Sequence, residues 1–93
     1  MIFEWDQRKA VSNLRKHGVT FAEAKSVFND PFAISKPDNN SDAIEERWLE
    51  LGLSHSGKLL VVWYTERDGC IRIIGCREAT KTERRAYEDE SAT

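Results

Sequence analysis

The segment LLVVWYTERDGCIRIIGCR, residues 59–77, decides the fold of this 93-residue chain. Its first part, residues 59–66, is rich in β-branched and aromatic side chains, a composition typical of a strand. Asp68-Gly69 is a favoured two-residue turn between antiparallel strands, and residues 70–77 supply the return strand. The segment therefore predicts a β-hairpin.

Helices and further strands are expected on both sides of this hairpin. Asp6 is placed to cap a first helix, and two capping boxes, Thr20 to Glu23 and Thr80 to Glu83, predict two more. The expected elements are a strand (1–5), helices (7–17 and about 21–28), strands (32–36, 46–54, 59–66 and 70–77) and a helix (about 81–87), with a turn-rich loop at 37–42. This order predicts one α+β domain over residues 1–93, in which two N-terminal helices and a C-terminal helix pack on an antiparallel sheet. Residues 88–93 are expected to form a frayed acidic tail.

The hairpin register predicts an anion site near the turn. With Asp68-Gly69 as the turn residues, Arg67 lies opposite Cys70 and Thr65 lies opposite Arg72. Because side chains alternate along a strand, Thr65, Arg67 and Arg72 share one face. Two guanidiniums and a hydroxyl suit a phosphate, since each guanidinium can bond bidentately. The commoner outcome of such spacing is a solvated face whose arginines pair with nearby carboxylates.

The face on which Arg77 lies depends on whether the return strand is regular or contains a bulge. In strict register Trp63 lies opposite Ile74 and Val61 opposite Cys76, which puts Arg77 on the face away from the anion site. A bulge at Gly75 would return Arg77 to the same face.

Two further groups of polar residues are candidates for the same chemistry. Lys9, Asn13 and Lys16 form one stripe of the first helix, with His17 one turn past Asn13. Glu46, just before a strand, is a candidate general base or a carboxylate that orients an arginine. For each group the alternative is a solvated surface, with Lys16 and His17 complementing the helix dipole.

Composition excludes several classes of protein. With 14 basic and 16 acidic residues the net charge is -2, which disfavours a protein that coats nucleic acid along its whole surface. The charge is nevertheless blocked: residues 1–25 and 51–77 are each net +2, whereas residues 26–50 are net -4 and residues 78–93 net -2. An anion site needs positive charge only where the anion binds, so a local phosphate-binding site stays compatible with this total.

Cysteine usage and hydropathy indicate the compartment. Cys70 and Cys76 lie in one expected strand, about 20 Å apart, which is far beyond disulfide reach. They are expected to be two buried thiols in a reducing compartment. No His/Cys spacing indicates a metal site or a cofactor, no apolar run approaches a membrane span, and the start MIFEWD is acidic. A cytoplasmic protein with no membrane association is expected.

The motifs also form a recognisable series. They are Phe3-Glu4-Trp5-Asp6, Lys16-His17-Gly18 followed by Phe21, Asp30-Pro31, Glu46-Arg47-Trp48, Tyr64-Thr65-Glu66-Arg67, Ile71-Arg72-Ile73-Ile74 and Arg77. In order and spacing they resemble the BrnT family of bacterial type II toxins, over roughly residues 1–88. The chain departs from the usual Ile-Ser-Ala-Arg of that family, because it reads Ile74-Gly75-Cys76-Arg77 and lacks the serine hydroxyl.

The resemblance implies a compact RelE-like fold and a ribonuclease that arrests growth by blocking translation. It implies a BrnA antitoxin with a ribbon-helix-helix DNA-binding part, and operator DNA bound only through that antitoxin for co-repression of the operon. The family's site positions correspond to Thr65, Arg67 and Arg72, and less certainly to Arg77, Lys9 and His17. We expect metal-independent cleavage with Arg67 and Arg72 clamping the phosphate and Thr65 positioning it. The base is open between His17 and Glu46.

The competing hypothesis is a non-catalytic binding module. The same cationic patch then docks an acidic partner or a nucleic acid without cutting it, or belongs to a decayed toxin that serves only as antitoxin partner and co-repressor.

Overall fold

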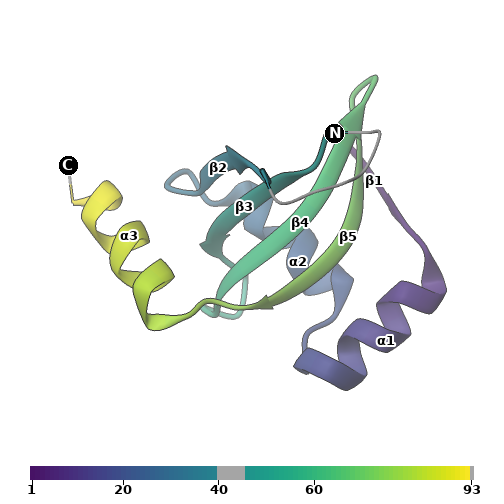
Figure 1. The fold of residues 1–93 in the computed structure, drawn as a ribbon, viewed down its shortest axis with the longest axis horizontal. Helices are drawn as coiled ribbons and strands as arrows, with labels where there is room; N and C mark the ends of the chain where they lie inside the picture. Colours follow the sequence, from purple (N-terminus) through teal and green to yellow (C-terminus); the bar gives the residue numbers. More distant parts are fainter. Residues whose placement is uncertain (40–45, 93) are drawn as a thin grey trace.

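The computed structural model describes residues 1–39 and 46–92. Its elements are β1 (Ile2–Trp5), α1 (Gln7–His17), α2 (Phe21–Ser26), the 3-10 turn η1 (Val27–Asn29), β2 (Ile34–Pro37), β3 (Trp48–Leu53), β4 (Leu59–Arg67), β5 (Cys70–Glu78) and α3 (Lys81–Ser91). The expected order of strands and helices is confirmed (Figure 1). The loop expected over residues 37–42 lies partly outside the described residues.

The helices begin where their capping residues predict, and α1 also ends at its expected glycine. The Asp6 carboxylate accepts hydrogen bonds from the amides of Arg8 and Lys9, and Gly18 ends α1 at a φ of 69°. Thr20 caps α2, and Thr80 and Glu83 form a complete capping box at the start of α3. These caps satisfy amides that the first turn of a helix leaves without partners. The last helix is longer than expected, because it continues past Tyr87 to Ser91.

The five strands form one mixed sheet in the order β1-β5-β4-β3-β2. The expectation of an antiparallel sheet is wrong at one edge, where β1 runs parallel to β5 with Glu4 opposite Arg72. Parallel neighbours need a long connection between them, and here residues 6–69 separate the two strands. Local side-chain alternation carries no information about strand direction, so the sequence did not predict this pairing.

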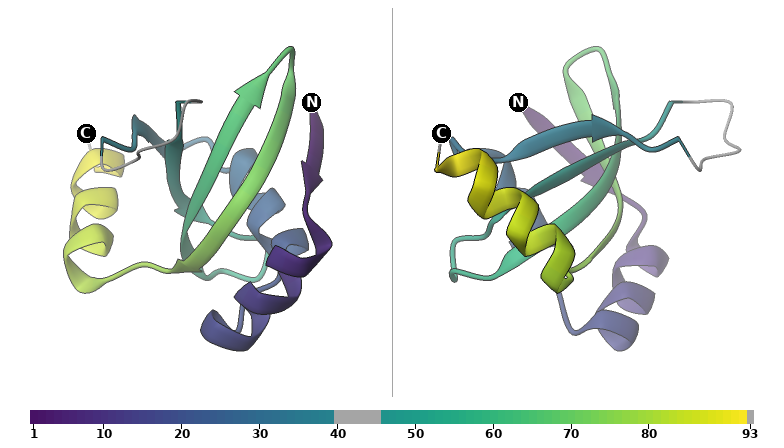
Figure 2. Two further views of the ribbon diagram at one scale, coloured as in Figure 1. Left: turned by 45° about the vertical axis from the view of Figure 1, so that its right-hand side comes forward. Right: turned by 60° about the vertical axis from the view of Figure 1, so that its left-hand side comes forward.

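Two apolar clusters lie on opposite faces of the sheet. On one face, Phe21, Ala24 and Val27 from α2 and η1 pack on core residues of β4 and β5. On the other face, Tyr87 of α3 packs against Leu51 and neighbouring residues of β3 and β4. Figure 2 shows α3 on one side of the sheet and α1 and α2 on the other. Among the described residues, no helix covers the part of the α3 face nearest the β4–β5 turn (Figure 2), which leaves room for a site.

Close packing between η1 and β3 depends on Gly52. A Cβ atom at this position would lie 3.0 Å from side-chain carbons of Val27 and Ala33 and 3.1 Å from a carboxylate oxygen of Asp30. The same Asp30 carboxylate accepts hydrogen bonds from the Leu53 amide and from the Tyr87 hydroxyl, at 2.9 and 2.6 Å. Asp30 therefore ties η1, β3 and α3 together at one point.

A β-bulge changes the hairpin register halfway along. Near the turn the predicted pairs, Arg67 with Cys70 and Thr65 with Arg72, are confirmed. Beyond Tyr64 the register shifts, so the strict-register pairs are wrong: Trp63 lies opposite Gly75, and Val61 opposite Arg77. One extra residue reverses the alternation, which places Arg77 on the same face as Thr65.

No helix in the described part of the chain is long and apolar enough to cross a bilayer.

Candidate active site

The open end of the α3 face holds a depression of about 320 Å³, which we call the clamp depression. It is lined by Glu4, Thr65, Arg67, Asp68, Cys70 and Arg72. The hairpin register therefore brings together the three residues predicted for phosphate binding, Thr65, Arg67 and Arg72. Arg67 and Arg72 lie near the β4–β5 turn, and both side chains are exposed to solvent. This arrangement is suited to an anionic group that arrives from solvent.

Glu4 is the residue of this depression that sequence reasoning missed. One of its carboxylate oxygens lies 3.5 Å from a guanidinium nitrogen of Arg72, and the two side chains are 54% and 45% exposed. Such an exposed pair contributes little to stability and yields readily to a phosphate. In the alternative considered from the sequence, Arg72 pairs with a carboxylate close to it in the hairpin. Its partner comes instead from β1, because the parallel pairing puts Glu4 opposite Arg72.

The two cysteines have different environments. Cys76 is buried in the core, as predicted, and burial raises the pKa of its thiol to about 12. Cys70 lies at the clamp depression and is only partly buried, so the expectation that it is a core residue is wrong. Desolvation and the Glu4 carboxylate both raise the pKa of the Cys70 thiol, which keeps it protonated at neutral pH.

A second depression, which we call the helix depression, lies between α1 and β5. It has a volume of about 280 Å³ and is lined by Lys9, Ser12, Asn13, Lys16, His17 and Ile74. The lysines and the imidazole predicted to share a helix face are therefore brought together. Ile74 is two residues after Arg72 on β5, about 7 Å along the strand, so the two depressions are close neighbours.

Asn13 has a structural position in this second depression. It is 8% exposed, and its amide nitrogen donates to the carbonyl of Val19 at 3.1 Å. Its side-chain oxygen accepts from the amide of Cys76 on β5 at 3.0 Å. Because both ends of the amide bind backbone inside the fold, we leave Asn13 out of the RNA contacts proposed below.

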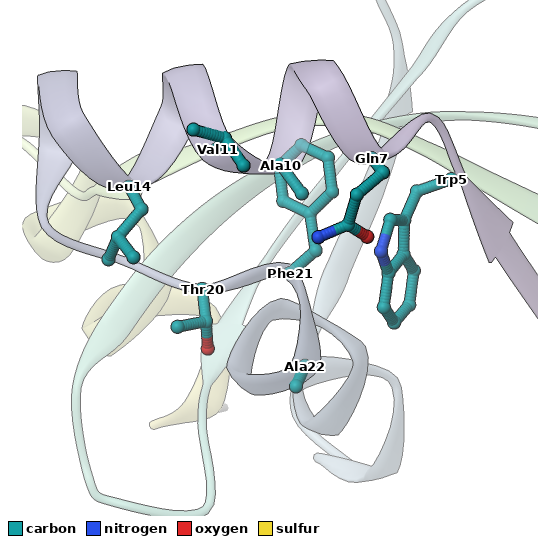
Figure 3. A pocket seen from close by; sticks show the side chains of 8 residues that line it. All are labelled: Trp5, Gln7, Ala10, Val11, Leu14, Thr20, Phe21 and Ala22. Atoms are coloured by element: carbon teal, nitrogen blue, oxygen red, sulfur yellow. The ribbon is translucent and has the colours of Figure 1, made fainter.

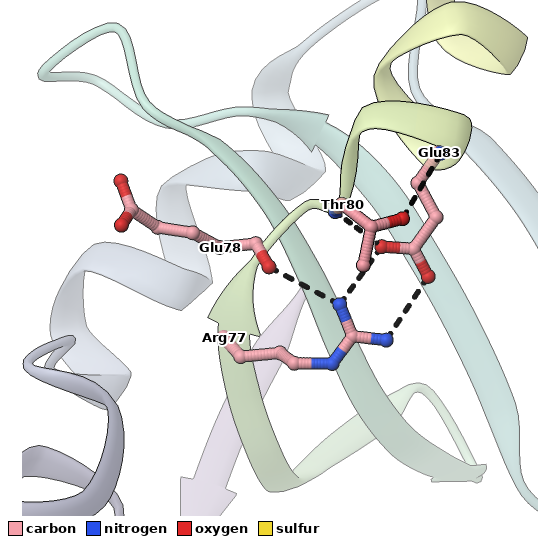
Figure 4. Close-up of polar contacts among 4 residues, drawn as sticks. All are labelled: Arg77, Glu78, Thr80 and Glu83. Carbon is pink, nitrogen blue, oxygen red and sulfur yellow. Dashed lines mark hydrogen bonds and ion pairs between the residues drawn. The ribbon is translucent and has the colours of Figure 1, made fainter.

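Arg77 is held by α3 (Figure 4). Its guanidinium makes two hydrogen bonds to the Glu83 carboxylate, at 2.8 and 3.0 Å, and lies 5.0 Å from the centre of the Trp63 ring. The bond from Arg77 is the main reason that the pKa of Glu83 falls to about 2. Arg77 thus shares the face of Thr65 but does not line the clamp depression, and its ion pair fastens the start of α3 to the sheet.

The remaining candidate acids and bases lie away from the clamp. Glu46 is exposed and lines neither depression. Tyr64 points to the opposite face, where its hydroxyl forms hydrogen bonds with Ser35 at 2.9 Å and Glu50 at 3.3 Å. Burial raises the pKa of the Glu50 carboxyl, which makes it another acid that sequence reasoning missed. Its position between Leu49 and Leu51 gave no signal, because strand alternation places it on the face opposite these leucines, and only the packing of α2 and η1 covers that face.

Within residues 1–39 and 46–92, no three His, Cys, Asp or Glu side chains are grouped so as to hold a metal ion. The cations instead gather at β5, in the clamp depression on its α3 face and in the helix depression between α1 and this strand. Fold and site together define a small α+β protein with a surface suited to a phosphate-bearing ligand.

The family is identified by a sequence profile that matches residues 5–83. The profile is described as "Ribonuclease toxin, BrnT, of type II toxin-antitoxin system". The chain belongs to this family. It is therefore a BrnT-family ribonuclease toxin of a type II toxin–antitoxin system, and the resemblance inferred from its motifs is confirmed.

A solved structure supports the same fold. The chain is similar to the crystal structure of the Brucella abortus ribonuclease toxin, BrnT, with a TM-score of 0.63 and 19% sequence identity, over 87% of this chain and 100% of that chain. At this identity the likeness shows the fold alone. No curated protein sequence matches the chain.

Proposed function

We propose that this toxin is a RelE-like endoribonuclease that cleaves RNA without a metal ion, at the clamp depression. The observation that carries the proposal is the grouping of Thr65, Arg67 and Arg72 in one solvent-open depression beside a carboxylate. In this reaction the 2′-oxygen of the RNA attacks the adjacent phosphorus and the bond to the 5′-oxygen breaks. The products are a 2′,3′-cyclic phosphate and a 5′-hydroxyl.

The arginines stabilise the charge that develops on the phosphate. A fixed cation is most effective where negative charge increases in the transition state, and guanidinium stays charged throughout. Arg67 and Arg72 act as the phosphate clamp, and the Thr65 hydroxyl donates a hydrogen bond that positions it. Lys9 and Lys16 bind the neighbouring phosphate at the helix depression.

We assign Glu4 as the general base. Glu4 and Asp68 both line the clamp depression, and Glu4 is the one that contacts Arg72, so a phosphate held by Arg72 puts the adjacent 2′-hydroxyl close to Glu4. A positioned base of this kind contributes about 10²- to 10⁴-fold to rate. His17, in the helix depression, is assigned to protonate the leaving 5′-oxygen, because a ring nitrogen of a protonated imidazole donates a hydrogen bond. Glu46 has no role in this scheme.

The wider biology follows from the family. Cleavage by the free toxin blocks translation and arrests growth in the bacterial cytoplasm. A BrnA-like antitoxin with a ribbon-helix-helix part neutralises the toxin, and the complex represses its operon through DNA bound by the antitoxin. Support for these statements comes from membership of a type II toxin–antitoxin family, which implies an antitoxin partner.

Substitution of the clamp tests the proposal. Purified Arg67→Ala and Arg72→Ala proteins should cleave total RNA in EDTA at least 10²-fold more slowly than the wild type, because each loses a cation that faces the phosphate. Glu4→Gln should be slowed to a similar extent. The measurement is initial cleavage rate together with the thermal midpoint, which should change little because these side chains are exposed.

Arg85→Ala is the matched control, since Arg85 is an exposed arginine on α3. Full cleavage by both clamp variants would refute the clamp, and cleavage that disappears in EDTA would refute metal independence. A wild-type protein that binds RNA without cutting it would favour the non-catalytic binding module.

A further inference from the structure

An apolar groove of about 220 Å³ lies between α1 and α2, outside both depressions of the candidate active site. Ala10, Val11 and Leu14 of α1 form one wall, and Phe21 and Ala22 of α2 form the other (Figure 3). Val11 and Leu14 are 45% and 48% exposed, although burial of Leu and Val side chains stabilises a folded protein. The groove is thus an apolar surface that the fold itself leaves uncovered.

The rim of the groove is basic. Arg8 and Arg15 are exposed and lie about one turn before and one turn after Val11 on the surface of α1. Lys25 follows Ala22 by one turn of α2 and is also exposed. The one acid of these two helices, Glu23, is engaged by the hydroxyls of Ser54 and Ser56. An occupant that complements this surface has an apolar stripe flanked by carboxylates.

We propose that this groove is the docking site for an acidic amphipathic helix of the antitoxin. The inference rests on the proposed function, in which an antitoxin neutralises this toxin. A helix laid into an apolar groove presents side chains at positions i, i+3, i+4 and i+7, and its acidic flanks meet Arg8 and Arg15.

Other occupants fit the groove less well. RNA has no apolar side chain to cover Val11 and Leu14. A second copy of this chain offers an acidic helix, α3, but the exposed surface near its end consists of Glu88, Asp89 and Glu90. Its large apolar residue, Tyr87, is already buried against the sheet.

The test measures antitoxin affinity and RNA cleavage separately. The toxin is freed from its co-expressed complex, refolded and titrated with the purified antitoxin encoded beside its gene. Leu14→Glu and Val11→Glu should each weaken binding at least tenfold, since both put a carboxylate in an apolar contact next to an acidic partner. Arg15→Glu should weaken it severalfold and reduce its dependence on salt.

Phe32→Glu is the matched control, because Phe32 is an exposed apolar residue, 57% accessible, that lines a different depression beside β2. It should bind the antitoxin as the wild type does. All four variants should keep the wild-type thermal midpoint and, without antitoxin, the wild-type cleavage rate, since none belongs to the clamp. Failure of the wild type to cleave RNA would count against the proposed function and leave the binding comparison intact.

Three results would overturn the docking site. The first is wild-type antitoxin affinity in Leu14→Glu and Arg15→Glu together. The second is loss of binding in Phe32→Glu, which would place the antitoxin at β2. The third is a wild-type toxin dimer that Leu14→Glu dissociates, which would assign the groove to a second copy.

Discussion

Arg77 and Glu83 show how one ion pair connects a helix start to the sheet. The Glu83 carboxylate accepts a hydrogen bond from the Thr80 amide at 2.8 Å within the capping box. It also accepts two hydrogen bonds from Arg77. Bidentate, charge-assisted bonds are among the stronger polar contacts in proteins. The guanidinium is therefore held against Trp63 by a partner from another element, and this favours a structural role over catalysis for Arg77.

The pKa of Glu83 predicts a pH-dependent loss of stability. Because the fold lowers this pKa from 4.5 to about 2, the pair stabilises the protein above about pH 4.5 and loses its contribution as the pH falls toward 2. Glu83→Gln should lower the free energy of unfolding by about 1 kcal/mol at pH 7 and by much less near pH 2.5. Urea denaturation at both pH values checks this.

Glu88→Gln is the matched control, as an exposed glutamate on the same helix. It should behave as the wild type at both pH values. An equal deficit of Glu83→Gln at pH 7 and pH 2.5 would contradict the assignment of the charge to this pair.

At the scale of elements, α1 contacts the edge of β5 at the point where the pairing with β1 has ended. The pairing of β1 with β5 ends at Trp5 and Ile73, and three residues later the Cys76 amide bonds the Asn13 side chain of α1. The side-chain nitrogen of Asn13 also donates a hydrogen bond to the Val19 carbonyl, in the connection between α1 and α2. One buried side chain thus fixes α1 to both the sheet and the next helix, and sets the position of Lys9 and Lys16.

Removal of this side chain should destabilise the fold. Asn13→Ala leaves a buried donor and a buried acceptor without partners, at about 1–3 kcal/mol for each group. We expect the free energy of unfolding to fall by about 3 kcal/mol in a denaturant titration. Ser12→Ala, a change at the adjacent exposed position, should alter it by less than about 0.5 kcal/mol. If Asn13 were an RNA contact instead, its loss would slow cleavage and leave stability unchanged.

For the whole molecule, net charge is less informative than its distribution. The chain is net -2, yet the proposed RNA face gathers cations from α1, β4 and β5. The acidic tail lies on α3, which packs over another part of the sheet. Positive charge is therefore concentrated where a phosphate would bind, while the total limits indiscriminate association with RNA.

Salt dependence tests this distribution. If Arg67 and Arg72 contact one phosphate and Lys9 and Lys16 contact the next, log affinity should fall with log salt concentration with a slope of about -1.4, at about -0.7 per phosphate of a single strand. The ligand is a 2′-O-methyl RNA, which cannot be cleaved because its nucleophile is blocked. Lys16→Ala should make the slope shallower by at most about 0.7, because Lys9 still contacts the same phosphate. Lys81→Ala, exposed on α3, should not change it, and an equal effect of both variants would refute a localised RNA face.

The sequence by itself determined the features that depend on near neighbours. Helix starts follow from side chains three residues apart, as Thr80 and Glu83 show. The two-residue turn sets the register of the first strand pairs, so the grouping of Thr65 and Arg72 was predictable. These interactions act within one element or across one tight turn, where spacing fixes geometry.

Only the tertiary structure decided the contacts between distant segments. It put Glu4 beside Arg72 through a parallel pairing, and it buried Asn13 between a helix and a strand. It also chose a bulged hairpin over a regular one, which turned Arg77 toward α3 and Glu83. Local alternation is equally compatible with either strand direction and with or without a bulge. The packing of the two apolar clusters on opposite faces of the sheet settles both, because it selects which side chains are buried.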